Sequence, residues 1–131
     1  MKKLIILFAF ISLITIIMVG LNYDSPEPGE LSPDQFITMF ESHPGIVIDV
    51  RTPEEFEEGH LMRSDYNYNF LSGEFEEKMQ ELNKSETYYL YCRTGNRSGQ
   101  AMEIMKEAGF ENVYNIGGFE DLVSIGIPAN Q

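Results

Sequence analysis

Residues 87–98 read Thr87-Tyr88-Tyr89-Leu90-Tyr91-Cys92-Arg93-Thr94-Gly95-Asn96-Arg97-Ser98, and they join an apolar run to a short polar loop. The run of apolar and aromatic residues before Cys92 is typical of a buried strand. Apolar residues recur at helical spacing through residues 98–108 and stop at Gly109, which predicts a helix behind the loop. This segment therefore predicts a strand, a tight turn and a helix in direct succession.

Strand and helix patterns alternate on both sides of this unit. The expected elements are a helix from residues 32–34 to Pro44-Gly45, a buried strand at 46–50, a short helix at 52–59, a strand near 66–70, a helix near 73–82, a strand at 113–116 and a helix near 119–123. Helices that separate consecutive strands act as crossovers, so the strands run parallel and the helices cover both faces. We therefore expect an α/β domain of three layers around a central parallel sheet.

The N-terminus has the pattern of a membrane segment. Met1-Lys2-Lys3 precedes residues 4–21, an apolar run that only Ser12, Thr15 and Gly20 interrupt. The run is long enough to cross a bilayer as a helix and longer than the apolar core of a cleaved signal peptide. We predict an uncleaved anchor at residues 1–21. Cleavage and secretion remain the alternative.

The distribution of basic residues predicts the orientation of this anchor. Lys2 and Lys3 precede the span, and the next basic residue is Arg51. The positive-inside rule then leaves the N-terminus in the cytoplasm and places the domain outside it. We expect a linker at residues 22–30, a domain at residues 31–131, and a location in a bacterial cell envelope, periplasmic or extracytoplasmic.

Composition excludes several classes of function. The chain carries 21 acidic and 9 basic residues, a formal net charge of −12, and therefore repels nucleic acid. Cys92 is the single cysteine, so no intramolecular disulfide can form. One cysteine and two distant histidines do not have metal-ligand spacing. We expect no metal and no cofactor.

The loop after Cys92 has the features of an anion cradle. It contains no bulky apolar residue, it has one glycine, and a helix begins where it ends. Backbone N–H groups, the helix N-terminus and the cations Arg93 and Arg97 should all lower the pKa of the thiol. We predict a nucleophilic thiolate at Cys92. The alternative is that Cys92 only ends a strand while the arginines pair with surface acids.

Three motifs resemble those of rhodanese-like sulfurtransferases. Residues 92–98 resemble that family's active-site loop, residues 49–56 with Gly59-His60-Leu61 resemble its upstream motif, and residues 115–119 resemble its closing motif. The resemblance covers residues 31–128. It implies a three-layer α/β domain that carries sulfane sulfur as a persulfide on the cysteine. The short, exported form is similar to small periplasmic thiosulfate sulfurtransferases.

The resemblance also implies roles for individual residues. Cys92 is the expected nucleophile, and Asp49 and Arg51 are expected to support the loop, with an ordinary surface ion pair as the alternative. The predicted substrate-binding residues, whose backbone amides hold the persulfide, are Arg93, Thr94, Gly95, Asn96, Arg97 and Ser98. The side chains of Arg93 and Arg97 should attract an anionic donor. His60 is expected to be a packing or capping residue.

The sequence departs from the family pattern in two places. Met62-Arg63-Ser64-Asp65 stands where the family has a small Gly-Ala step, so we expect a different pocket wall there. The last helix lacks the usual tryptophan. Neither change falls in the Cys92 loop, so we expect them to affect the choice of substrate and not the chemistry at the cysteine.

Three functions fit these residues. The first is an enzyme that takes sulfur from thiosulfate or a persulfide and passes it to cyanide or a thiol. The second is a carrier that delivers persulfide sulfur to a protein partner in the envelope. The third is an arsenate reductase or phosphatase on the same fold. The loop from Cys92 to Arg97 has six residues, and the resemblance associates this length with sulfurtransferases and one residue more with related phosphatases and arsenate reductases. The shorter loop favours sulfur, because a tetrahedral oxyanion needs a wider ring of donors.

Overall fold

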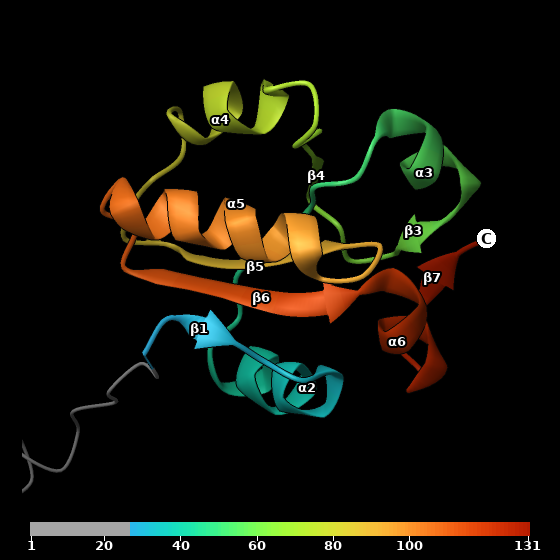
Figure 1. The fold of residues 1–131 in the computed structure, drawn as a ribbon. Coiled ribbons are helices and arrows are strands. Elements are labelled where there is room, and N and C mark those ends of the chain that lie inside the picture. Colours follow the sequence, from blue (N-terminus) through green and yellow to red (C-terminus); the bar gives the residue numbers. More distant parts are fainter. Residues whose placement is uncertain (1–26) are drawn as a thin grey trace, which may run out of the picture.

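The computed structural model describes residues 27–131, so the predicted anchor at residues 4–21 lies outside the described residues (Figure 1). Within residues 27–131, no helix combines the length and the apolar character that a membrane crossing requires. The described part comprises the predicted domain and the last residues of the predicted linker.

The core of the domain is a five-stranded sheet in the order β1-β6-β5-β2-β4. Its strands are β1 Gly29–Glu30, β2 Ile46–Asp49, β4 Tyr66–Asn67, β5 Thr87–Cys92 and β6 Asn112–Gly118. Every pair of neighbours in this sheet is parallel. A second, small antiparallel sheet joins β3 His60–Leu61 to β7 Ala129–Asn130. The expected central parallel sheet is confirmed.

Helices cover both faces of this sheet, as Figure 1 shows. They are α2 Pro33–Ser42, α3 Pro53–Glu58, α4 Glu74–Met79, α5 Asn96–Glu107 and α6 Phe119–Ser124. α4 and α5 lie on one face and α2 lies on the other, while α3 and α6 gather beyond the end at which β5 and β6 finish. The three-layer α/β architecture is therefore confirmed.

The central strand β5 contributes to the apolar core on both of its faces. Tyr88, Leu90 and Cys92 pack on the side of α5, whereas Tyr89 and Tyr91 pack on the side of α2. Successive side chains of a strand point to opposite faces, so a strand buried on both sides must be apolar throughout. This burial fixes β5 in the middle of the sheet and places its last residue, Cys92, at the sheet's carboxyl edge.

Several boundaries differ from the prediction. Gly29 and Glu30 pair with β6, so the sheet includes the last two residues of the expected linker. The strand expected at 66–70 ends at Asn67, because its partner β2 ends at Asp49 in the same register. The helix expected at 73–82 spans only Glu74–Met79.

The helix after the loop also begins earlier than expected. α5 starts at Asn96, two residues before the predicted start at Ser98. The reason is Gly95, which has a φ of 91° and turns the chain into the helix at once. The loop between β5 and α5 is therefore only three residues long, from Arg93 to Gly95.

Candidate functional site

The Cys92 loop depends on glycines at two points. A Cβ on Gly95 would lie 3.3 Å from Gly117 Cα, and its positive φ disfavours other residues. A Cβ on Gly118 would lie 2.5 Å from the carbonyl oxygen of Arg93. The end of β6 can therefore approach the loop only as backbone, and this close contact holds the loop over the end of the sheet.

The Cys92 sulfur is buried and surrounded by hydrogen-bond donors. The Gly95 N–H donates to Sγ at 3.1 Å, and the Ser98 hydroxyl lies 3.3 Å from it. Burial by itself raises the pKa of the Cys92 thiol, but the Ser98 hydroxyl and the amides of Ser98, Thr94 and Gly95 outweigh burial, and the net pKa is lowered. The geometry therefore favours a thiolate held by N–H and O–H donors.

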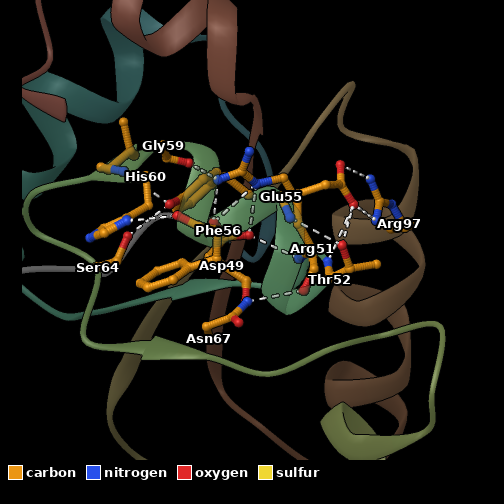
Figure 2. Close-up of polar contacts among 12 residues, drawn as sticks. Asp49, Arg51, Thr52, Glu55, Phe56, Gly59, His60, Ser64, Asn67 and Arg97 are labelled. Carbon is orange, nitrogen blue, oxygen red and sulfur yellow. Dashed lines mark hydrogen bonds and ion pairs between the residues drawn. The ribbon is translucent and has the colours of Figure 1, made fainter. Parts of the chain in front are cut away.

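Arg97 does not lie free beside the sulfur. Its guanidinium makes two hydrogen bonds to Glu55 of α3, at 2.7 Å from Nη1 to Oε1 and at 3.0 Å from Nη2 to Oε2 (Figure 2). The Arg97 hydrogen bond is the main reason that the pKa of Glu55 falls to about 2. The sequence analysis gave pairing of the loop arginines with acidic side chains as an alternative, and Arg97 does form such a pair with Glu55. Attraction of the donor by Arg97 stays a prediction.

Asp49 and Arg51 form a buried ion pair, so the alternative of a surface ion pair is wrong. Asp49 is 0% and Arg51 5% exposed, and Arg51 Nη2 lies 2.7 Å from Asp49 Oδ2. Arg51 also donates to the Gly59 carbonyl at 2.6 Å (Figure 2). Its guanidinium lies 4.5 Å from the centre of the Phe119 ring. The pair joins the end of β2 to α3 and α6.

Asn115 of β6 is a buried polar residue whose part in the site the sequence analysis missed. Its Nδ2 donates to the Gly95 carbonyl at 3.0 Å and to Glu30 at 3.3 Å. Its Oδ1 accepts from the Gly117 N–H at 3.1 Å and from the Ser98 hydroxyl at 2.7 Å. A polar residue within an apolar strand was the available signal, because buried polar groups find partners. Asn115 thereby ties the loop to its neighbouring strand.

The Ser98 hydroxyl has two acceptors and only one hydrogen. The backbone partners of Asn115 fix its side-chain orientation, so its Oδ1 can only accept. Ser98 therefore donates either to Asn115 Oδ1 or to Cys92 Sγ. We expect ionisation of Cys92 to turn this hydroxyl toward the sulfur.

A cavity of about 440 Å³ borders the loop at Arg93. Its charged lining consists of two guanidinium groups and three carboxylates, from Arg51, Arg93, Glu55, Glu58 and Glu120. The Met62–Asp65 segment, which we expected to form a wall, does not line this cavity. Among residues 27–131, no group of acidic, histidine and cysteine side chains is placed to hold a metal ion.

The segment in place of the family's Gly-Ala step packs elsewhere. Arg63 lies over the Phe40 ring at 4.2 Å from its centre, and Ser64 Oγ lies 2.8 Å from the Tyr91 hydroxyl. His60 stacks on Phe56 with 3.8 Å between ring centres, and its Nδ1 lies 2.9 Å from the Phe56 carbonyl oxygen. These side chains have packing roles, and for His60 this agrees with the prediction.

Comparison with known proteins extends this description. The sequence profile of the Rhodanese-like domain matches residues 32–124. Thiosulfate sulfurtransferase PspE of Escherichia coli is 36% identical over 77 residues, which cover 57% of this chain and 71% of that protein. The uncharacterized protein YqhL of Bacillus subtilis is 28% identical over 121 residues, which cover 92% of each chain.

A solved structure shares the fold. The rhodanese-related protein of Thermoplasma volcanium superimposes with a TM-score of 0.64 at 26% identity, covering 77% of this chain and 96% of that one. The profile match spans most of the described domain, including the Cys92 loop, the buried Asp49–Arg51 pair and the closing Gly117-Gly118 turn. The chain therefore belongs to the rhodanese-like domain family.

Proposed function

We propose that this protein is a sulfurtransferase that carries sulfane sulfur as a persulfide on Cys92. The observation that carries the proposal is the set of donors around Sγ, the Gly95 N–H at 3.1 Å and the Ser98 hydroxyl at 3.3 Å. Such donors stabilise a thiolate before the reaction and an anionic persulfide after it. The names of family relatives as thiosulfate sulfurtransferases support the same chemistry.

The reaction divides into two displacements at sulfur. The Cys92 thiolate attacks the outer sulfur of the donor, an S–S bond forms, and the donor's own S–S bond breaks with its electron pair. Thiosulfate releases sulfite, and a persulfide RS–SH releases the thiolate RS⁻. A thiophilic acceptor then attacks the outer sulfur of the Cys92 persulfide and returns the thiolate. Cyanide leaves as thiocyanate, and no external oxidant or reductant is required.

The burial of Cys92 favours sulfur over a tetrahedral oxyanion. The sulfur is fully enclosed, while Arg93 and Thr94 of the loop and Asn96 at the start of α5 are exposed. A donor must therefore present its reacting atom to the interior of a three-residue turn. A single terminal sulfur fits this requirement better than a phosphate or arsenate, which needs donors around three oxygens.

The direct test is mass spectrometry of the full-length protein after incubation with thiosulfate or with a thiol persulfide. We expect the protein to gain one sulfur atom, cyanide to remove that atom as thiocyanate, and Cys92→Ser to abolish both events. Hydrolysis of an aryl phosphate that depends on Cys92, without any gain of sulfur, would establish the phosphatase alternative instead.

We also propose that the domain is anchored in the membrane of a bacterial cell and faces away from the cytoplasm. Lys2-Lys3 and the apolar residues 4–21 support this location. A C-terminal reporter that is active only in the cytoplasm should be silent on the full-length chain, and a reporter active outside it should give signal. Full-length protein in the cytosolic fraction would contradict the proposal.

A further inference from the structure

Three arginines lie near the carboxyl edge of the sheet, and two of them are already neutralised. Arg51 pairs with Asp49 at 2.7 Å and Arg97 pairs with Glu55 at 2.7 Å. Arg93 is exposed and takes part in none of the ion pairs formed within residues 27–131. Only one of the three positive charges is therefore free to attract an anion.

The cavity beside the loop adds negative charge. Glu58 and Glu120 line it together with Glu55, and both are exposed. With Arg51 and Arg93 as the cations of the lining, the formal charge of the cavity wall is −1. A dianion that enters this cavity meets about twice the electrostatic repulsion that a singly charged donor meets, and a neutral donor meets none.

The Arg97–Glu55 ion pair is geometrically strong but not sealed in the core. It is bidentate, which is the favoured geometry of a guanidinium with a carboxylate. Its side chains remain 17% and 26% exposed, so an anionic ligand could reach the guanidinium only by competing with Glu55. Glu55 also accepts from the Thr52 N–H at 3.3 Å, which holds the carboxylate in place at the start of α3 (Figure 2).

We infer that Glu55 is a specificity-determining residue: by holding Arg97, it makes the Cys92 site select uncharged or singly charged thiol persulfides over dianionic donors such as thiosulfate. The inference rests on the proposed function, whose donor it narrows. In the selected reaction, the Cys92 thiolate takes the outer sulfur of RS–SH, and the RS⁻ group leaves with the electron pair and the single charge. Thiosulfate instead must bring two charges in and release them as sulfite.

The test variant is Glu55→Gln in the full-length protein. Glutamine keeps an oxygen that can accept from the Thr52 N–H, so the start of α3 is preserved. Glu54→Gln is the matched control, because Glu54 is an exposed residue of the same helix that does not line the cavity. For Glu55→Gln we expect KM for thiosulfate to fall about five- to tenfold at low ionic strength, and KM for cysteine persulfide, which carries less negative charge, to fall about threefold or less.

A second readout does not require sulfur transfer. Iodoacetamide and iodoacetate alkylate the same thiol, but iodoacetamide is neutral and iodoacetate is an anion. The ratio of the iodoacetate rate to the iodoacetamide rate should rise at least about threefold in Glu55→Gln, and high salt should suppress the rise. Because alkylation needs only a reactive Cys92, this readout can succeed even if the protein never accepts sulfur. Failure of the proposed function is thus distinguishable from failure of this inference.

A double-variant cycle separates the release of Arg97 from a simple loss of negative charge. If Glu55 acted only through its own charge, Glu55→Gln would raise the ratio equally in the wild-type and the Arg97→Gln backgrounds. We expect a rise at least about threefold larger when Arg97 is present, because only then is a guanidinium freed to bind the anion. Equal rises in both backgrounds, or an equal effect of Glu54→Gln, would overturn the inference. So would a wild-type kcat/KM that is higher for thiosulfate than for cysteine persulfide.

Discussion

Two arginine–carboxylate pairs at the same edge of the sheet differ in their surroundings. Arg51 and Asp49 lie in the interior, where Arg51 also donates to the Gly59 carbonyl at 2.6 Å and lies over the Phe119 ring. Arg97 and Glu55 make an equally short contact of 2.7 Å, but water can reach both side chains. Breaking the first pair would leave a charge buried without a partner. Breaking the second pair would not, because water can solvate the separated charges.

This difference separates a structural role from a role in donor selection. A buried charge that loses its partner is strongly destabilising, whereas a partly exposed pair contributes little to stability. The Arg51–Asp49 pair is therefore suited to fixing β2 against α3 and α6. The Arg97–Glu55 pair is suited to controlling how much positive charge the Cys92 loop presents. Three measurements test this division.

The largest effect is expected for Arg51→Met. Removing the guanidinium leaves the Asp49 carboxylate buried and unpaired, which should lower the free energy of unfolding by about 3–5 kcal/mol. Urea denaturation of the full-length protein measures the change. The double variant Asp49→Asn with Arg51→Met should regain most of the loss. It removes both charges and keeps a side-chain oxygen at position 49 that can accept from the backbone N–H of residue 51. A single variant as stable as the wild type would remove the distinction between the two pairs.

Arg97→Ala should have a smaller effect, seen in reactivity rather than stability. It removes a positive charge that interacts with Cys92 and leaves Glu55 unpaired, so the pKa of Cys92 should rise and KM for thiosulfate should increase about tenfold. The free energy of unfolding should change by about 1 kcal/mol or less. The pH dependence of iodoacetamide alkylation reports the thiol pKa. An unchanged alkylation profile together with an unchanged KM would show that Arg97 has no such influence.

The smallest effect concerns the acid stability of the second pair. The pKa of Glu55 falls from 4.5 to about 2, chiefly through its hydrogen bond from Arg97. A carboxyl group with a lowered pKa contributes stability that is fully present above its unfolded pKa and is lost as pH falls toward the folded pKa. The window therefore runs from about pH 4.5 down to about pH 2. The contribution should be about 1 kcal/mol or less because the pair is partly exposed.

Glu55→Gln tests this window directly. The stability difference between wild type and variant should be constant above pH 5 or so and should shrink through the acid window, as measured by denaturation at a series of pH values. Glu54→Gln provides the comparison for a surface acid in the same helix turn. A difference that grows as the pH falls would have the wrong sign for this ion pair.

Much of the fold was predictable because the local patterns are strong. The apolar run of β5 and the helical spacing after Gly95 place Cys92 at a strand-to-helix turn without reference to the rest of the chain. The ends of β4 and β6 were less predictable, because a strand ends where its partner's pairing ends rather than at a sequence signal. β1 was missed because a strand of two residues is too short to show any periodicity.

The candidate site divides in a similar way. Residue types and spacing along the chain indicated a nucleophilic Cys92, a glycine turn and nearby cations, since these belong to one continuous loop. Only the tertiary structure showed that Arg97 is paired with Glu55, 42 positions away, and that Asn115 holds both Gly95 and Ser98. Such partners come from different elements that meet at the sheet edge. Their distances depend on how those elements pack, and no local pattern encodes that packing.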